Sequence, residues 1–486
     1  IRLTKKDILE LYLNNLPFGY NVEGLTSASR FYYGTELMAL TKGQMCCLSV
    51  IPRRPASYNP FDNPENCAEA AFQIYTTAFK KSLPKTEIAL SSDSSNELKE
   101  YLLKSAQESK RYEWPFLMPH FIRFVEKKIK PGTNKVTLTA RSNLQKFVEF
   151  KINEALKSSS SSRIQNAAIL VIDNKTADIL SWAGSNDWFD EEHGGQIDGV
   201  LVPNQPGSSM KPFLYALALE PKNSDGEPLF TPAQVLPDIP MEFGSSNLYI
   251  PLNFNNRFNG PVLFRTSLAS SLNVPAVYIL SKIGVDNYLE FLLNAGFESL
   301  RVDGKKADLG LALGAGEVSL AELVTAFSIF PRDGQYIPLN FLSGQNTSPK
   351  SKKIIQTDTA RIICNMLSDK AARVKGFGYS QVFETEYPSI FKTGTANQYQ
   401  NIVALGATTE YTVGVWMGNF SGNTVVGKTG SSLPASIAKD ILDFLTGSEV
   451  QEFSEPVNWK KIPVCSVSGM CIGPDCSSSV YEYVPS

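Results

Sequence analysis

A run of five serines, Ser158–Ser162, marks a change in the pattern of this chain. Before the run, apolar residues recur at helical spacing, as in Leu25–Tyr33 and in Leu144–Leu156. After it, Ala167–Val171 and Asp178–Ala183 form short β-rich runs around a turn of Asp, Asn, Lys and Thr, which is a hairpin signal. The serine run is therefore the best predicted domain boundary. A second polar stretch, Ser91–Ser95, is predicted to be an exposed loop or linker.

The later part of the chain alternates predicted helices with predicted strands. Helices packed around an antiparallel sheet, with strands from both ends of the segment, define an α+β domain. We therefore expect an α+β fold in which an antiparallel sheet is flanked by helices. The helices are expected at Ser208–Leu219, Thr359–Asp369 and Ser431–Leu445, and the strands at Ser389–Thr395, Ile402–Thr408 and Tyr411–Met417.

Charge and histidine content exclude several classes of function. The formal net charge of −2 over 486 residues provides no basic field for nucleic acid. The two histidines, His120 and His193, are too few for a multi-histidine metal site, and neither lies in a recognisable catalytic-triad context. We expect no metal, no cofactor and no nucleic-acid partner.

The seven cysteines are too sparse for a disulfide framework. Cys465, Cys471 and Cys476 cluster, and the sequence leaves open whether they form one short-loop disulfide or stay free thiols. Apolar runs such as Met45–Ile51 are too short to cross a bilayer, and no signal peptide is visible. Because the chain starts at Ile1, we expect a fragment or processed form whose membrane anchor lies elsewhere.

Three short motifs occur in order along the chain. Ser208-Ser209-Met210-Lys211 is S-x-x-K at a helix start, Ser271-Leu272-Asn273 is S-x-N, and Lys392-Thr393-Gly394 is K-T-G on a strand. This set is the signature of serine acyl-transfer sites. Each motif alone is weak, and the ordered trio in matching contexts is specific.

Each spacing has a chemical reason. An (i, i+3) pair places Ser208 and Lys211 on one helix face, and a lysine stripped of water beside another cation, Lys392, can be neutral enough to accept the serine proton. Ser271 can relay a proton, and Asn273 can orient a substrate amide. The helix N-terminus favours the developing oxyanion.

The K-T-G strand supplies the remaining expected contacts. Gly394 has no side chain, so a substrate backbone can lie along the strand. The hydroxyls of Thr393 and Thr395 can bind a substrate carboxylate. These three residues are the predicted substrate-binding group.

Two of these motifs occur a second time in the chain, so the functional copy of each has to be identified. Ser82-Leu83-Pro84-Lys85 is a second S-x-x-K, but its proline and polar surroundings predict a loop. Lys428-Thr429-Gly430 is a second K-T-G, which lies between the last strand and a helix. The copy at Lys392 follows the apolar pair Ile390-Phe391 and leads into strands. We therefore predict Ser208 and Lys392 as the functional copies.

With these residues in view, the chain resembles the class A penicillin-binding proteins, and the 1C subtype most of all. The segments that carry the resemblance are Gln205–Phe213, Ser270–Ala276 and Phe391–Thr395, with the 1C-like spacers Gly184-Ser185, Gln196–Asp198 and Leu236–Pro240 and the 1C-like C-terminal start Cys465–Gly469. The resemblance implies a penicillin-binding transpeptidase fold related to serine β-lactamases.

The first part of the chain carries an independent resemblance. Lys6–Asn14, Phe18-Gly19 and Phe31–Gly34 are similar to the end of the family's glycosyltransferase domain. The two catalytic glutamate motifs of that domain would precede Ile1, so we expect this chain not to polymerise glycan, although its parent could. The expected domains are 1–62, a glycosyltransferase remnant; 63–162, a linker; 163–448, the transpeptidase; and 449–486, the start of a 1C-type C-terminal domain.

The sequence departs from the family after K-T-G-T. The family often has a serine there and then Asp-Ala-Trp, whereas this chain has Ala396 and then Asn401-Ile402-Val403. These changes put contacts between the substrate and the loop after the strand in doubt. They leave the three motifs intact.

The resemblance implies that Ser208 attacks the D-Ala-D-Ala bond of a peptidoglycan stem peptide, with Lys211 as base and Ser271 as relay, and that β-lactams acylate Ser208. It also implies a place in the cell envelope, outside the cytoplasmic membrane, and other cell-wall synthesis proteins as partners. A D,D-carboxypeptidase, a β-lactamase-like hydrolase and a non-catalytic wall-binding scaffold remain alternatives. The trio speaks against the scaffold, and no deacylating glutamate is identifiable for the β-lactamase.

Overall fold

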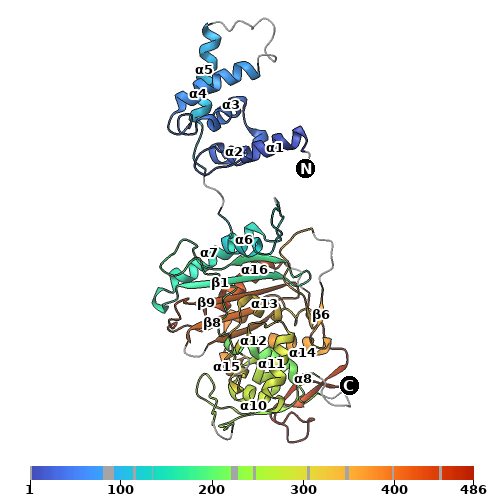
Figure 1. Ribbon diagram of the computed structural model, residues 1–486. Helices are drawn as coiled ribbons and strands as arrows, with labels where there is room; N and C mark the ends of the chain where they lie inside the picture. Colours follow the sequence, from blue (N-terminus) through green and yellow to red (C-terminus); the bar gives the residue numbers. More distant parts are fainter. Residues whose placement is uncertain are drawn as a thin grey trace. The chain divides into compact units, whose positions relative to one another are not determined.

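The computed structural model divides into two compact units, Ile1–Leu117 and Met118–Ser486 (Figure 1). Each unit is described by itself. The residues that the structure describes are 3–79, 92–112, 116–133, 135–220, 228–244, 248–303, 307–344, 350–396, 399–447 and 451–486.

The first unit is helical in its described residues. Helix α1 begins with the predicted capping box, in which the Asp7 amide donates to the Thr4 hydroxyl (3.2 Å) and the Thr4 amide to the Asp7 carboxylate (2.8 Å). None of the α1 side chains is buried. The helices are α1 (Lys5–Asn15), α2 (Leu25–Tyr33), α3 (Lys42–Val50), α4 (Pro64–Ala78) and α5 (Ser92–Gln107), with 3₁₀ turns at Leu37–Ala39 and Ile51–Arg53.

Helix α5 corrects one expectation from the sequence. The polar stretch Ser91–Ser95 suggests an exposed loop, yet the helix runs from Ser92 to Gln107. Serine and aspartate are favourable in the first turn of a helix, where they satisfy unpaired amides and complement the helix dipole. The rest of the helix is held by packing, because Leu102 and Ala106 are fully buried in a cluster with residues of α3 and α4.

The second unit is built on a five-stranded sheet of order β2-β1-β9-β8-β7, in which every neighbouring pair is antiparallel. Its strands therefore come from both ends of the unit, as predicted. The central pairing joins β1 to β9, with Asn166 opposite Gly418 and Asp173 opposite Tyr411. The strands are β1 (Asn166–Asp173), β2 (Ile179–Ala183), β7 (Ile390–Thr395), β8 (Asn401–Ala407) and β9 (Tyr411–Gly418).

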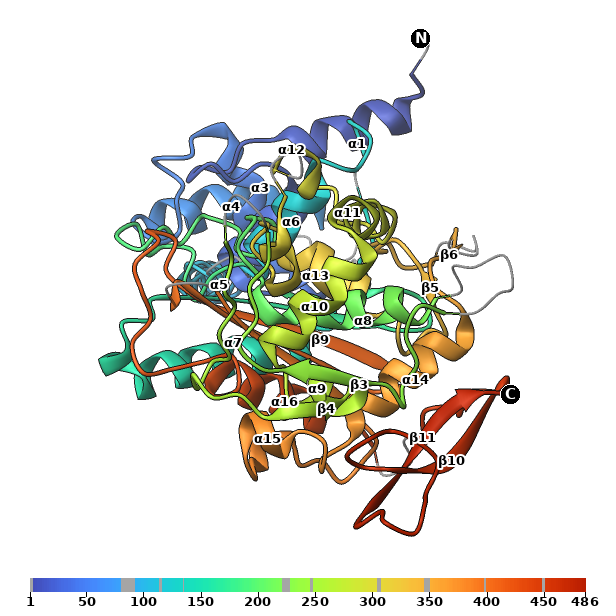
Figure 2. The same cartoon turned by 90° about the horizontal axis from the view of Figure 1, so that it is seen from below.

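Helices cover both faces of this sheet, so its strands are buried throughout. On β1, Ile169 and Val171 pack with helices α7 (Ser142–Ser158) and α16 (Leu433–Leu445). The alternate residues, such as Leu170, face a larger cluster that includes residues of α8 (Lys211–Leu219) and α13 (Leu320–Phe327). Both helices are labelled in Figure 2. The α+β fold predicted from the sequence is confirmed.

The remaining elements surround the larger cluster or follow it in the chain. They are α6 (Pro119–Glu126), η5 (Gly207–Met210), α8 (Lys211–Leu219), β3 (Val235–Asp238), β4 (Gly260–Leu263), α9 (Phe264–Ala269), α10 (Asn273–Ile283), α11 (Val285–Asn294), α12 (Leu300–Asp303), η7 (Leu309–Leu313), α13 (Leu320–Phe327), β5 (Gln335–Tyr336), β6 (Lys352–Lys353), α14 (Thr357–Ser368), α15 (Val374–Phe377), η8 (Gln381–Phe383), β10 (Trp459–Cys465) and β11 (Ser479–Pro485). Strands β10 and β11 form an antiparallel hairpin.

Along the chain, the first unit ends at Leu117 and the second begins at Met118, which is earlier than the boundary expected at the serine run. Helix α7 accounts for the difference. Its residues Leu144, Val148 and Ile152 are fully buried against the sheet, so it belongs to the second unit. The serines end α7 and form a short 3₁₀ turn that leads into β1.

Candidate active site

The nucleophile candidate lies in a tight turn at the start of α8. Ser208 is in the 3₁₀ turn η5, and the Lys211 amide donates to the Ser208 carbonyl, which closes the turn. The α-helix itself begins at Lys211, slightly later than predicted. Ser208 is half-buried, so it is partly exposed to solvent.

The Lys211 ammonium lies inside the protein, where it contacts the S-x-N motif. The side chain is fully buried, and Nζ donates to the Ser271 carbonyl (2.6 Å), the Leu272 carbonyl (2.9 Å) and Asn273 Oδ1 (2.7 Å). Three acceptors match the three protons of an ammonium. A neutral amine has two protons and one lone pair, so loss of a proton would release one of these acceptors.

Burial lowers the pKa of Lys211 well below its ordinary value, and the nearby Lys392 cation lowers it further, while the negative charge of Asp238 acts in the opposite direction. Burial and the Arg373 guanidinium also lower the pKa of Lys392, to about 7. Both buried lysines therefore release a proton more readily than an exposed lysine does. A lowered pKa is the condition that a lysine general base requires.

Ser271 lies between the two lysines in the polar network. The Lys392 ammonium donates to the Ser271 hydroxyl and to the Thr393 carbonyl, both at 2.8 Å, while the Ser271 carbonyl accepts from Lys211. Ser271 has φ +58°, a left-handed conformation that is uncommon for a residue other than glycine. Such conformations occur where the surrounding structure forces them, often at functional sites.

A second layer of polar groups holds Asn273 in place. Its amide nitrogen Nδ2 donates to the Leu252 carbonyl (2.7 Å), and its backbone amide donates to Asn253 Oδ1 (2.8 Å). Asn253 donates in turn to the fully buried carboxylate of Asp238 (2.7 Å), which also accepts from the backbone and side chain of Asn259. Sequence reasoning missed Asn253 and quoted Asp238 only within a spacer.

Glycines allow three backbone segments to meet around Ser208. A Cβ at Gly394 would lie 2.0 Å from the Pro206 carbonyl oxygen, and one at Gly207 would lie 2.4 Å from that of Thr395. A Cβ at Gly314 would meet the Gly207 carbonyl oxygen at 2.2 Å. Side chains at these positions would therefore push the segments apart. The sequence suggested that Gly394 is a glycine to admit substrate, and the structure adds this closer packing reason.

The predicted substrate-binding residues lie on β7 beside the nucleophile turn. Thr393 is buried, and the Thr395 hydroxyl accepts from the Gly430 amide at 3.3 Å. Gly430, from the second K-T-G, thus packs against the first copy, whereas Lys428 lies on a loop. Ser82, from the second S-x-x-K, lies outside the described residues.

The departures from the family pattern have structural roles here. The Ala396 amide donates to the Asn401 carbonyl (2.9 Å) and extends the pairing of β7 with β8. Asn401 Oδ1 accepts from the indole of Trp416 (3.0 Å) on β9. The sequence raised a doubt about substrate contacts at these positions, and in the structure the Asn401 side chain bonds within the sheet.

The histidines are engaged elsewhere. His120 Nε2 lies 2.9 Å from the Gly195 carbonyl oxygen, and His193 Nδ1 lies 2.8 Å from the Asp190 carboxylate. Among the described residues, no group of three or more histidine, cysteine, aspartate or glutamate side chains is placed to hold a metal ion.

Family comparisons fit this geometry. The penicillin-binding protein transpeptidase domain matches residues 167–443, and the transglycosylase family matches residues 1–78. The chain belongs to the class A penicillin-binding proteins. The predicted family and the predicted penicillin-binding transpeptidase fold are both confirmed.

Two relatives from well-studied bacteria illustrate the likeness. Penicillin-binding protein 1C of Escherichia coli (strain K12) is 30% identical over 444 residues, which cover 91% of this chain and 54% of that protein. Penicillin-binding protein 1F of Bacillus subtilis (strain 168) is 26% identical over 490 residues, covering 94% of this chain and 64% of that protein. The chain thus spans less than two thirds of the length of each.

Solved structures share the fold. Penicillin-binding protein 1A from Haemophilus influenzae has a TM-score of 0.74 with 18% identity, and the match covers 99% of this chain and 91% of that one. The PonA1 protein from Mycobacterium tuberculosis, solved in complex with penicillin V, has a TM-score of 0.56 with 19% identity, covering 70% of this chain and 94% of that one.

Proposed function

We propose that this penicillin-binding protein is a serine D,D-transpeptidase that cross-links peptidoglycan stem peptides and that β-lactams acylate. One observation carries the proposal: the buried Lys211 and Lys392 ammonium groups both bond to the S-x-N motif, and Lys211 follows the partly exposed Ser208 by three positions. These contacts support the proposal because the same three motifs are the signature of serine acyl-transfer sites.

In the proposed first step, Ser208 Oγ forms a bond to the carbonyl carbon of the penultimate D-Ala, and its proton moves to neutral Lys211. The tetrahedral intermediate then loses its C–N bond. The proton passes from Lys211 through the Ser271 hydroxyl to the leaving amine, and the terminal D-Ala departs. The products are an ester at Ser208 and a free amino acid.

In the second step, an amine from a neighbouring stem peptide attacks the ester carbon. The amine loses a proton to Lys211, and the Ser208 oxygen leaves and is reprotonated, which restores the enzyme and forms the cross-link. In both steps Asn273 orients the donor peptide. The hydroxyls of Thr393 and Thr395, on the strand beside the turn, bind the terminal carboxylate.

The proposed setting is the cell envelope, outside the cytoplasmic membrane, where stem peptides and cell-wall synthesis proteins are the partners. No helix among the described residues is both long and apolar enough to span a bilayer. We propose glycosyl transfer for the parent protein, from the transglycosylase match at residues 1–78.

Covalent labelling by a fluorescent penicillin tests the proposal. We expect one acyl adduct per chain by intact-mass spectrometry, located at Ser208 by peptide mapping, and no adduct on the Ser208→Ala variant. Ser82→Ala is the matched control, because Ser82 belongs to the second S-x-x-K, and this variant should label normally. An adduct at Ser82, or undiminished labelling of Ser208→Ala, would contradict the proposal.

Product analysis separates the alternative acceptors. With a donor peptide ending in D-Ala-D-Ala and an added amine, a transpeptidase releases D-Ala and forms the new amide. A D,D-carboxypeptidase gives only the hydrolysed peptide, and a β-lactamase-like enzyme turns over penicillin without retaining the adduct.

A further inference from the structure

The C-terminal hairpin, which is mostly exposed, carries one fully buried carboxylate. Most side chains of β10 and β11 are partly or fully exposed, but the Glu482 side chain is 0% exposed. Burial raises the pKa of Glu482, and the charge of Arg265 opposes that rise. A buried carboxylate is tolerated only where it is paired, so this glutamate needs a specific partner.

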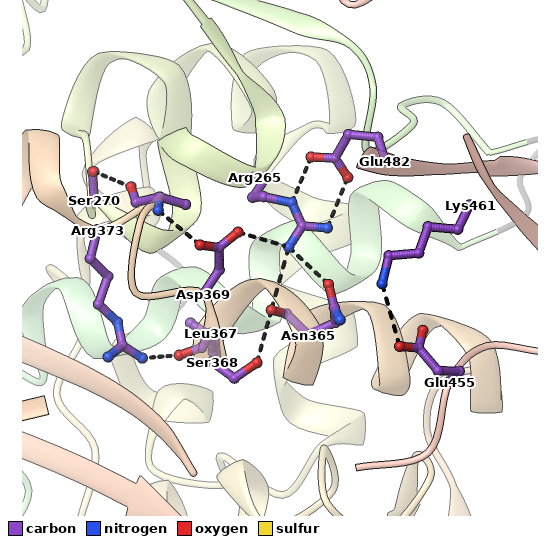
Figure 3. Close-up of polar contacts among 11 residues, drawn as sticks. Arg265, Ser270, Asn365, Leu367, Ser368, Asp369, Arg373, Glu455, Lys461 and Glu482 are labelled. Carbon is purple, nitrogen blue, oxygen red and sulfur yellow. Dashed lines mark hydrogen bonds and ion pairs between the residues drawn. The ribbon is translucent and has the colours of Figure 1, made fainter. Parts of the chain in front are cut away.

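The partner is Arg265 at the beginning of α9. Its Nε donates to Glu482 Oε1 (2.6 Å) and its Nη2 to Oε2 (2.9 Å), which is a two-point contact between two nearly buried groups. Nη1 donates to Asn365 Oδ1 (2.8 Å) on α14 and approaches Asp369 Oδ2 (3.4 Å). Figure 3 shows the guanidinium between Glu482 of the hairpin on one side and Asn365 and Asp369 on the other.

The network continues from Asp369 toward the S-x-N motif. Asp369 Oδ1 accepts from the Ala372 amide (2.9 Å), and the Ala372 carbonyl accepts from the Ser270 hydroxyl (2.6 Å). Ser270 directly precedes Ser271. Helix α9 is therefore held at its first turn by Arg265 and at its end by Ser270, both through the segment around residues 369–372.

Two features of the active site depend on this segment. Ser271 has φ +58°, so the adjacent backbone must hold it there. The segment approaches closely, since a Cβ on Gly376 would lie 2.0 Å from the Ser270 carbonyl oxygen. Arg373 lies in the same segment, and its cation helps to lower the pKa of Lys392.

We propose that Glu482 and Arg265 are positioning residues for the transpeptidase reaction. Through α9 and residues 369–373, their ion pair fixes the Ser271 hydroxyl and the Arg373 cation against Lys392. The C-terminal hairpin is thus a functional part of the active-site support. This inference rests on the proposed function of Ser208, Ser271 and the two lysines.

A positioning role predicts a change in the pH profile of acylation that a purely structural role does not. The groups that face Lys392 are the Arg373 and Lys211 cations, the Ser271 hydroxyl and the Thr393 carbonyl. If the segment with Arg373 relaxes away, a repulsive charge is removed and Lys392 keeps its proton to higher pH. The pH profile of acylation should then move, in addition to a fall in rate.

The test is the second-order acylation rate of the full chain with a fluorescent penicillin, measured across pH. Glu482→Gln keeps the shape and removes the charge. We expect it to lower the rate about tenfold to a hundredfold, as small misplacements of reacting groups do, and to shift the Lys392-dependent part of the profile to higher pH. Asp333→Asn is the control for loss of a two-point contact on α14, because Asp333 bonds Arg361 in the same way (2.8 and 2.9 Å) but is 47% exposed. Asp333→Asn should change the acylation rate by no more than about twofold and leave the pH profile in place.

The proposal is wrong if folded Glu482→Gln has the acylation rate and the pH profile of the parent. It is also wrong if Glu482→Gln and Asp333→Asn have equal effects. If Glu482→Gln does not fold, Arg265→Lys keeps the charge but loses the planar fork. It should show the same slower, shifted acylation, and a normal profile would again refute the inference. Failure of the proposed function is distinguishable, because the parent chain itself would then form no adduct.

Discussion

Replacement of Lys392 by methionine should slow acylation and remove a pH-dependent stability penalty. The residue is 3% exposed, and burial together with the Arg373 cation lowers its pKa from 10.5 to about 7. A buried charge of this kind is maintained for chemistry at the expense of folding free energy. Methionine has a similar length, fills the space and has no proton to lose.

The magnitude follows from linkage. A pKa difference of one corresponds to about 1.4 kcal/mol. Because the folded-state pKa of Lys392 lies below the unfolded value, the unfolded chain binds more protons between pH 7 and 10.5, and stability rises with pH across that window. The penalty that methionine removes is about 5 kcal/mol below pH 7, about 4 kcal/mol at pH 7 and about 2 kcal/mol at pH 9.

Loss of the hydrogen bonds to Ser271 and Thr393 reduces this gain. Leaving buried acceptors unpaired costs about 1–3 kcal/mol each, but that cost does not depend on pH. The decisive quantity is therefore how the stability difference between variant and parent changes with pH. The free energy of unfolding of Lys392→Met, relative to that of the parent, should fall by about 2 kcal/mol between pH 7 and pH 9.

Urea unfolding followed by tryptophan fluorescence measures this difference, because four of the five tryptophans lie in the second unit. Lys428→Met is the control and should show no such change with pH. The acylation rate should fall at least about tenfold for Lys392→Met, which corresponds to about 1.4 kcal/mol of transition-state stabilisation, and stay near normal for Lys428→Met. A stability difference that is constant from pH 7 to 9, or a larger rate loss at Lys428, would refute the reasoning.

Three further outcomes are expected. Gly394→Ala should lower the melting temperature and the penicillin labelling, because its Cβ would meet a backbone carbonyl oxygen at 2.0 Å, whereas Gly447→Ala, where the space is open, should do neither; equal effects in thermal melts would contradict this. Asp238→Asn should shift the acid side of the acylation profile to lower pH, since the negative charge of the carboxylate raises the pKa of Lys211; an unshifted profile would argue against this charge effect. Alkylation of Cys465 should rise through about pH 6, because hydrogen bonds lower the pKa of its thiol to about 6, and peptide mass spectrometry would show whether it does.

Much of the fold was predictable because its signals are local. The strands around Lys392 and the β1–β2 hairpin are marked by apolar runs bounded by turn residues, and they form close to the predicted limits. Helix α7 was assigned to a linker, because an amphipathic pattern shows that a helix buries one face and does not show which unit receives it. The polar start of α5 misled for a related reason, since serine and aspartate suit both loops and helix N-termini.

In the candidate site, too, some residues could be predicted from the sequence and others could not. The motif residues Ser208, Lys211 and Lys392 could be named from spacing, and in the structure the two lysines bond to the S-x-N segment. The supporting Asn253 and Arg373 could not, because each acts through contacts with residues distant in sequence and carries no motif. Their roles follow only from the three-dimensional arrangement.

The pairing of β1 with β9 has a consequence for how this domain folds. The polar contact beside it joins Gln165 to Asn419, which are 254 positions apart. Closing so long a loop costs entropy before the sheet returns any stability, and topologies dominated by such distant pairings fold slowly. Ser208, Ser271 and Lys392 all lie inside that loop, so we expect the site to form together with the pairing of the strands that close the loop. The appearance of penicillin-labelling competence during refolding should therefore report the closure of the central sheet.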